Sequence, residues 1–121
     1  MPELLFIYGT LHPDRAPAEI ADAARRLTSI GRGTIRARLY NLGSYPGIVL
    51  DNTARKPVPG EVFLVPDATT FARLDWYEDF RPDDPTHSLY LRKKTIVTFD
   101  DGSQQSCWVY VYNREPALTD N

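Results

Sequence analysis

Apolar positions along the chain recur with two different periods, which predict a mixture of strands and helices. Short apolar runs and alternating apolar and polar positions, both typical of strands, occupy residues 3–8, 34–42, 48–50, 60–65, 88–99 and 103–112. Apolar residues at three- and four-residue spacing predict helices at residues 17–29 and 68–78. We expect Gly31 and Gly33 to end the first helix, and Asp67 to cap the start of the second.

Turn signals between these elements indicate the fold class. Asp101 and Gly102 separate the last two extended runs, and an Asp-Gly step between strands is a strong hairpin signal. Proline and aspartate residues through 79–87 are typical of a loop. More strands than helices, with an antiparallel final hairpin, indicate an α+β fold with a compact, barrel-like mixed sheet rather than a doubly wound parallel sheet. We expect one domain over residues 1–113 and a flexible C-terminal tail at residues 114–121.

Composition and charge narrow the class of protein. The 121 residues are 42% hydrophobic, and 14 basic against 16 acidic residues give a net charge of −2, so the chain lacks the basic stripe typical of nucleic-acid binding. A single cysteine, Cys107, excludes an intrachain disulfide and fits a reducing compartment. No stretch approaches the roughly 18 apolar residues of a membrane span. We therefore expect a cytoplasmic protein, a monomer or weak homodimer, with no nucleic-acid or membrane partner.

The segment after the first apolar run contains a candidate binding site. A predicted strand leads into Tyr8, Gly9, Thr10 and Leu11. Glycine just past a strand permits a sharp turn and leaves its N–H uncovered, so that consecutive amides can bind an anion or a developing oxyanion. The alternative is an ordinary turn beside a buried Tyr8. A phosphate loop is excluded, because its lysine and glycine spacing are absent.

The second predicted helix directs a carboxylate toward its apolar side. At about 100° per residue, Phe71 and Leu74 define the apolar face, and Glu78 falls between them. Burial would raise the pKa of Glu78 toward the range that a general base needs at neutral pH. We expect the neighbouring Asp79 to raise that pKa further.

A structural role for Glu78 is equally open from the sequence. If the helix has ended by residue 78, Glu78 either caps it or forms an ion pair with Arg81 or Arg92. Tyr90 and Arg92 share one face of a strand, where Tyr90 would line a pocket and Arg92 would orient a carboxylate. For Arg92 we favour an ordinary structural pair. Asp75 lies at the edge of the helix's apolar face.

The remaining polar and aromatic residues give weaker signals. Trp108, Tyr110 and Tyr112 share a face of the last predicted strand, and we interpret them as core or pocket wall. His12 and His87 lack partners at the spacing of metal ligands, so no metal site is predicted.

Several short segments together resemble the γ-glutamylcyclotransferase-like (AIG2-like) family. In chain order they are FIYGTL (6–11), GSYPGIVL (43–50), VPGEVFLV (58–65), LDWYED (74–79), YLR (90–92) and WVYVYN (108–113). The resemblance covers nearly the whole chain and implies a mixed-sheet barrel with flanking helices. Two positions depart from the family pattern: His12-Pro13 stands where many relatives carry a basic residue, and Asp79 where many carry glycine.

The resemblance also implies a site and a reaction. It implies that Tyr8, Gly9, Thr10 and Leu11 hold the γ-glutamyl head group, and that Glu78 acts as general acid and base. The reaction would be the intramolecular aminolysis of a small γ-glutamyl amide, which gives 5-oxoproline and a free amine. An enzyme of this transferase or lyase type needs no metal or cofactor.

Two other functions remain open from the sequence. An amide hydrolase would use Glu78 to activate water and would release glutamate instead of 5-oxoproline. A non-catalytic module would bind a small γ-glutamyl compound without turning it over. The sequence does not identify the leaving amine.

Overall fold

Seven strands and two α-helices are present in residues 3–8, 16–41 and 46–113, the part of the chain that this computed structural model describes. In chain order the elements are β1 (Glu3–Ile7), α1 (Ala21–Ala24), β2 (Thr28–Ile35), β3 (Ala37–Asn41), β4 (Pro46–Leu50), β5 (Val58–Val65), α2 (Ala68–Tyr77), a 3-10 turn η1 (Pro85–His87), β6 (Tyr90–Phe99) and β7 (Gln104–Tyr112). None of the helices in these ranges is long and apolar enough to cross a membrane. The expected tail at residues 114–121 lies outside the described residues.

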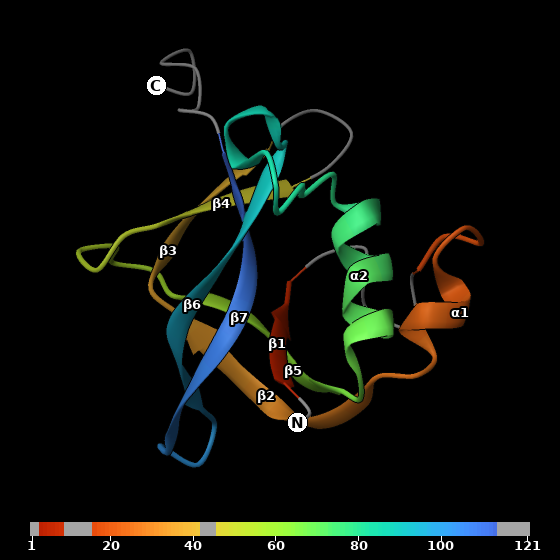
Figure 1. The fold of residues 1–121 in the computed structure, drawn as a ribbon. Helices are drawn as coiled ribbons and strands as arrows, with labels where there is room; N and C mark the ends of the chain where they lie inside the picture. The colour runs from red at the N-terminus through yellow and green to blue at the C-terminus, as the bar shows by residue number, and fades with distance from the viewer. Residues whose placement is uncertain (1–2, 9–15, 42–45, 114–121) are drawn as a thin grey trace.

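Five strands close into a barrel in the order β1-β5-β2-β6-β7. The barrel is a mixed sheet, because β1 pairs antiparallel with β5 but parallel with β7, where Leu5 lies opposite Trp108. Strands β3 and β4 form a separate antiparallel ribbon. Figure 1 shows α1 and α2 together on one side of the barrel and the ribbon on the other. The predicted α+β, barrel-like fold is confirmed.

The core has two layers, one within the barrel and one between the barrel and the helices. Side chains of the inner layer include Phe6, Val62, Val97, Cys107 and Val109. The outer layer joins strand residues to both helices and includes Leu5, Ile7, Ile20, Phe71, Leu74 and Tyr110. Successive residues of β1 enter alternate layers, because neighbouring side chains of a strand point to opposite faces. The outer layer therefore fixes α2 against β1 and β7.

The first helix is shorter than the sequence predicts, and its expected terminal glycines lie within a strand. Helix α1 has only four residues, and Gly31 and Gly33 belong to β2. Gly31 has a φ of 151° at an irregularity in the pairing of β2 with β5. A Cβ on Gly33 would lie 2.6 Å from the carbonyl oxygen of Thr98. These glycines permit a bulge and a close strand approach, so the predicted helix at residues 17–29 was wrong over most of its length.

The second helix and the final hairpin form where the sequence predicts them. The carboxylate of Asp67 accepts a hydrogen bond from the Thr70 N–H at 2.7 Å, which caps the start of α2. Strands β6 and β7 pair antiparallel through the turn at Gly102, which has a φ of 89°. The C-terminal ends of β1 and α2 point to the same end of the molecule, where β6 begins and β7 ends (Figure 1).

Candidate active site

Glu78 is the residue that terminates α2, and its side chain is half-buried. Its backbone N–H donates to the carbonyl of Leu74 at 3.0 Å, so the helical hydrogen bonding extends to this residue. Burial raises the pKa of the Glu78 carboxyl group to about 7, in the direction that the sequence predicts. Glu78 does cap the helix, but the arginines expected as alternative partners pair elsewhere: Arg81 with Asp79 at 3.1 Å, and Arg92 with another carboxylate.

Electrostatic interactions link Glu78 to Tyr8, which directly follows β1, and to Tyr110 in β7, and they link Tyr8 to Tyr90 in β6. Burial raises the pKa of Tyr8, and the neighbouring Tyr90 and Glu78 raise it further. Burial likewise raises the pKa of Tyr110, and nearby carboxylates, among them Glu78, raise it further. Tyr90 is only 5% exposed and packs edge-on against Tyr112, with 5.9 Å between ring centroids. Tyr8 and Tyr90, both predicted site residues, are thus brought together with Glu78.

Tyr8 connects the end of β1 to β7. Its hydroxyl donates to the backbone carbonyl of Tyr110 at 2.8 Å. This bond fixes the point at which the chain leaves the barrel and enters the predicted binding loop. The other predicted loop residues, Gly9, Thr10 and Leu11, lie outside the described residues, so their role stays a prediction.

Asp75, one helical turn before Glu78, is a second and more deeply buried carboxylate. It is 7% exposed, and the hydroxyl of Tyr110 donates to its Oδ1 at 2.6 Å. The Nε of Arg92 lies 3.6 Å from the same oxygen, which makes an ion pair without a hydrogen bond. Burial raises the pKa of Asp75, whereas the Tyr110 hydrogen bond and the Arg92 charge lower it. The sequence placed Asp75 only at the edge of the apolar face and gave no indication of this network.

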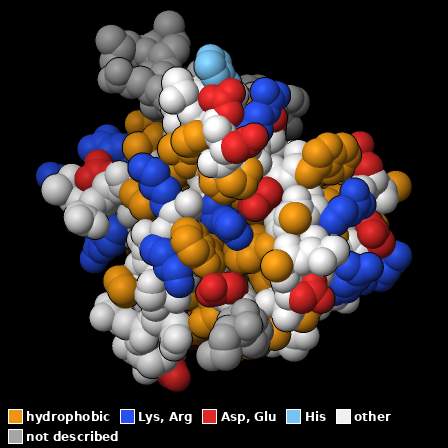
Figure 2. All heavy atoms as spheres, in the orientation of Figure 1, with side chains coloured by type: hydrophobic (Ala, Val, Ile, Leu, Met, Phe, Trp, Pro, Cys, Tyr) orange, Lys and Arg blue, Asp and Glu red, His pale blue; other side chains and the backbone are white. Residues whose placement is uncertain are grey.

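Aromatic rings hold Arg92 beside Asp75. The guanidinium carbon lies 3.9 Å from the ring centroid of Phe71 and 4.9 Å from that of Trp108, distances at which cation–π attraction operates. Figure 2 shows basic, acidic and hydrophobic side chains gathered on this face, between the β6–β7 hairpin and α2. The interpretation of Arg92 as part of a structural pair is confirmed, and its partner is Asp75.

Asp79 forms the turn that ends α2. Its φ is 55°, in the left-handed region that favours glycine. The N–H groups of Asp79 and Phe80 donate to helix carbonyls at 3.1 and 2.9 Å, as in a Schellman motif. The Asp79 carboxylate pairs with Arg81, and burial is the cause that raises the Glu78 pKa. The expectation that Asp79 adds to that shift was therefore wrong.

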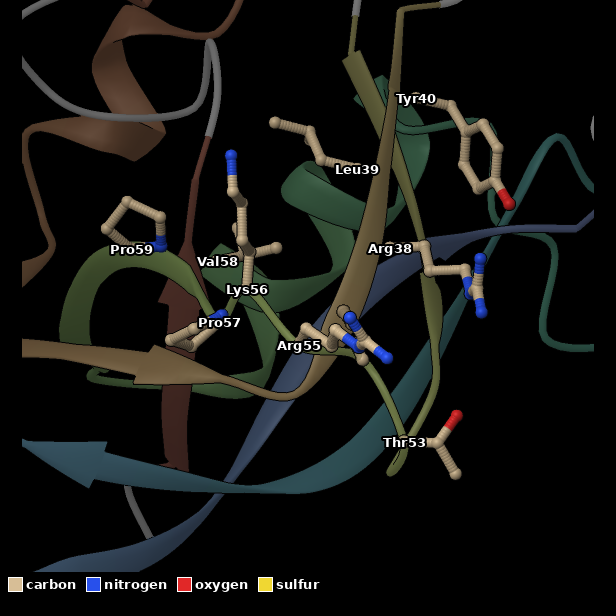
Figure 3. A pocket seen from close by; sticks show the side chains of 11 residues that line it. Arg38, Leu39, Tyr40, Thr53, Arg55, Lys56, Pro57, Val58 and Pro59 are labelled. Atoms are coloured by element: carbon tan, nitrogen blue, oxygen red, sulfur yellow. The ribbon is translucent and has the colours of Figure 1, made fainter. Parts of the chain in front are cut away.

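A separate hollow of about 630 Å³ lies between β3 and the loop that precedes β5. Figure 3 shows its lining side chains, which come from residues 37–40 and 53–59. Arg38, Arg55 and Lys56 make it basic, and Arg38 forms an ion pair with Asp51. None of the predicted site residues lines it, so it is not the candidate active site. Among the residues that the structure describes, no group of three or more His, Cys, Asp or Glu side chains could hold a metal ion.

Comparisons with known proteins agree with this fold. The family model described as "Gamma-glutamyl cyclotransferase, AIG2-like" matches residues 5–121. A Vibrio cholerae protein, provisionally named gamma-glutamylcyclotransferase, is 33% identical over 118 residues, which cover 98% of this chain and 89% of that protein. Gamma-L-glutamyl-butirosin B gamma-glutamyl cyclotransferase of Niallia circulans is 32% identical over 119 residues, which cover 98% of this chain and 71% of that protein.

A solved structure extends the likeness to three dimensions. The crystal structure of an AIG2-like protein from Mus musculus superposes with a TM-score of 0.73 at 23% identity, covering 95% of this chain and 80% of the mouse chain. At this identity the match demonstrates a shared fold. Together with the family model and the two relatives, it shows that the chain belongs to the γ-glutamyl cyclotransferase, AIG2-like family.

Proposed function

We propose that this protein is a γ-glutamyl cyclotransferase that converts a small γ-glutamyl amide to 5-oxoproline and a free amine. One observation carries the proposal: a half-buried glutamate, Glu78, whose pKa is raised to about 7, lies among Tyr8, Tyr90 and Tyr110. A carboxyl group with that pKa is ionised and protonated in comparable amounts at neutral pH. It can therefore both accept and return a proton during one turnover.

The reaction follows from the chemistry of the substrate. The α-amine and the γ-carbonyl belong to one molecule, so the enzyme has mainly to fold the substrate into attack geometry. Ionised Glu78 removes a proton from the α-ammonium group, and the free amine attacks the γ-carbonyl carbon to form a five-membered ring. Protonated Glu78 then returns the proton to the departing nitrogen as the amide C–N bond breaks. The regenerated carboxylate takes the second proton from the ring nitrogen and passes it to the released amine, which leaves as an ammonium ion. Atoms balance without water, and the carboxylate is regenerated.

The rest of the proposal concerns substrate binding. Tyr8 and Tyr90 are expected to contact the substrate, and the backbone amides of Gly9, Thr10 and Leu11 are expected to bind the α-carboxylate or the developing oxyanion. The substrate is a small γ-glutamyl compound, and the reaction takes place in the cytoplasm without a metal or cofactor. The name of the Niallia relative adds γ-glutamyl aminoglycosides to the compounds worth testing.

Mass-spectrometric detection of products across a substrate panel tests the proposal. The panel contains γ-glutamyl dipeptides, γ-glutamyl amines and γ-L-glutamyl-butirosin B. Each is incubated with the wild type, with Glu78→Gln, and with Asp51→Asn, a control whose altered carboxylate lies in the separate ribbon region. We expect 5-oxoproline from the wild type and the control, and none above background from Glu78→Gln.

The products distinguish the alternatives. Release of glutamate in place of 5-oxoproline would identify an amide hydrolase that uses Glu78 to activate water. If no panel member is turned over by any form, and the wild type and Glu78→Gln bind γ-glutamyl ligands equally well, the protein is a binding module.

A further inference from the structure

The edge of β3 that faces away from β4 has no partner strand in the part of the chain that the structure describes. Arg36 and Asp51 are opposite each other in the register of the ribbon, and the Asp51 N–H donates to the Arg36 carbonyl at 3.2 Å. Hydrogen-bonded pairs alternate with non-bonded pairs along antiparallel strands. The N–H and C=O groups of Ala37 and Leu39 therefore point away from β4, to the open edge.

The hollow of about 630 Å³ lies along this open edge. Its lining includes every residue from 37 to 40, together with loop residues 53–59. Because the side chains of a strand alternate between its two faces, a hollow over one face would be lined by every second residue. Figure 3 shows Leu39 pointing to the opposite side of β3 from Arg38 and Tyr40. Lining by consecutive residues therefore places the hollow at the edge, where the backbone groups of β3 face it.

The loop on the other side of the hollow is attached to β3. Arg36 Nη1 donates to the carbonyl of Ala54 at 2.9 Å. The Asp51 carboxylate accepts hydrogen bonds from the N–H and hydroxyl of Thr53 at 2.8 and 2.6 Å, and it pairs with Arg38. These contacts hold the loop beside the strand, so the hollow is preformed.

The charge of the hollow favours an acidic occupant. Arg38, Arg55 and Lys56 are cationic, and none of the described lining residues is acidic. Asp51 pairs with Arg38, whereas the exposed Arg55 and Lys56 have no ion-pair partner among the described residues. The whole chain has a net charge of −2, opposite in sign to this cluster. A second copy that paired edge to edge would bring like charges together, which disfavours self-association here.

We propose that the open edge of β3 binds an extended acidic segment of a partner protein, which adds to the ribbon as a third strand. Ala37 is 2% exposed and Leu39 is 57% exposed, so Leu39 supplies the accessible N–H and C=O groups for the new pairing. Acidic side chains of the segment pair with Arg55 and Lys56. None of the candidate active-site residues lines the hollow, so this inference goes beyond the cyclotransferase proposal and does not depend on it.

Fluorescence anisotropy with a labelled peptide tests the proposal. The probe is a short capped peptide of alternating glutamate and valine, titrated with the full-length protein at low salt. One matched probe carries lysine in place of glutamate, and another carries a methyl group on every internal backbone nitrogen. We expect both to bind at least about tenfold more weakly, because the first reverses the charge and the second removes the N–H donors of the added strand.

Substitution of Leu39 tests the backbone pairing from the side of the protein. Leu39→Pro removes the N–H that points to the open edge and leaves the β3–β4 hydrogen bonds in place. Leu39→Ala is the matched control, because it shortens the same side chain and keeps the N–H. Leu39→Pro should weaken binding of the acidic peptide at least about fivefold, and Leu39→Ala less than about twofold.

A pair of double variants tests the charge. Arg55→Gln with Lys56→Gln should weaken binding of the acidic peptide about fivefold. Arg25→Gln with Arg26→Gln removes two exposed, adjacent cations at the end of α1, on the other side of the barrel (Figure 1), and should change binding less than about twofold. Melting temperatures establish that each variant is folded. If Leu39→Pro is not, the methylated peptide decides whether backbone pairing occurs.

Each of the other outcomes overturns the proposal. Failure of the wild type to bind the acidic peptide would remove the site. Equal binding of the methylated peptide would show that the hollow attracts anions by charge alone. Equal effects of the two double variants would place the binding elsewhere on the surface. A wild-type dimer that Leu39→Pro converts to a monomer, measured by analytical ultracentrifugation, would show that the edge pairs with a second copy instead.

Discussion

Glu78, at the end of α2, and Asp51, which follows β4, carry the same functional group in opposite environments. Burial raises the pKa of Glu78 to about 7. Hydrogen bonds from Thr53 and Arg38 lower the pKa of Asp51 to about 2, and the Arg38 side chain is 59% exposed. Both regions contain charged residues, and a hollow lies beside Arg38, the partner of Asp51. Desolvation raises the pKa of Glu78 toward neutral pH, whereas hydrogen bonds keep Asp51 ionised over the whole neutral range.

The region around Glu78 also contains two unequal carboxylates of its own. Asp75 has a hydrogen-bond donor and an arginine close to one oxygen, whereas the arginines near Glu78 pair with other residues. The hydrogen bond from Tyr110 to Asp75 joins α2 to the barrel. Glu78, which has no such partner among these arginines, keeps its raised pKa. We infer that the Asp75 network holds the framework within which Glu78 can be desolvated.

Loss of activity gives the largest expected contrast between the two regions. Glu78→Gln should lower kcat by about 10³-fold, because general acid–base catalysis contributes about 10²–10⁴-fold. Asp51→Asn should change kcat by less than about twofold, since Asp51 lies outside the candidate site. The rate of 5-oxoproline formation is the measurement. Substantial activity in Glu78→Gln would remove Glu78 from the mechanism.

The ion pairs Arg92–Asp75 and Arg38–Asp51 allow the stability of the two regions to be compared. Arg92→Ala should lower the free energy of unfolding by about 3 kcal/mol, because it leaves the buried Asp75 without its cationic partner. Arg38→Ala breaks an exposed, solvent-screened ion pair and should lower the free energy of unfolding far less. Urea denaturation of both variants measures the difference. Equal losses would mean that the Asp75 network does not anchor α2.

The pH dependence of stability should have opposite signs at the two carboxylates. The pKa of Glu78 is higher in the folded protein (about 7) than its ordinary value of 4.5, so the folded state binds the proton more tightly. Ionisation of Glu78 therefore destabilises the fold progressively as the pH rises from about 4.5 to about 7. Glu78→Gln should match the wild type at pH 4 and exceed its stability by up to about 3 kcal/mol at pH 8.

Asp51 should behave in the reverse way. Its folded-state pKa of about 2 lies below its ordinary value of 3.8, so its contribution to stability is present above pH 3.8 and is lost as the pH falls through 2. Asp51→Asn should therefore lose stability at neutral pH and approach the wild type in acid. Denaturant titrations of both variants at several pH values measure these trends. If the stability difference for Glu78→Gln does not change with pH, Glu78 is not desolvated.

Local sequence signals predicted the parts of the fold and site that depend on near neighbours. Asp67 and the apolar residues of α2 predicted both the helix and the inward direction of Glu78, because helical geometry alone fixes that direction. The Asp-Gly step at residues 101–102 likewise predicted the final hairpin.

Predictions from the sequence were wrong or incomplete where contacts between distant residues decide the structure. Only two of the eight residues of β2 are buried, so its alternation was too weak to detect, and glycines needed for strand contacts resembled a helix terminus. The hydrogen bond between Asp75 and Tyr110 joins residues 35 positions apart. Such a pair leaves no local pattern, which is why the more deeply buried carboxylate was overlooked.

Asp79 provides the smallest expected effect, and it tests whether the pKa of Glu78 depends on its immediate neighbour. A non-glycine residue at a φ of 55° is strained, so Asp79→Gly should stabilise the fold by up to about 1 kcal/mol. Gly102, with a φ of 89° in the β6–β7 turn, is the reciprocal control, and Gly102→Ala should destabilise by a similar amount.

The pH–rate profile of Asp79→Gly then isolates the cause of the Glu78 shift. Because the Asp79 carboxylate faces Arg81 and burial raises the pKa of Glu78, the acid limb of kcat/KM should remain near pH 7. Loss of the Asp79 charge would lower that limb if like-charge repulsion contributed to the shift. An unchanged limb in a more stable protein would show that the turn at Asp79 can be relaxed without altering the desolvation that distinguishes Glu78 from Asp51.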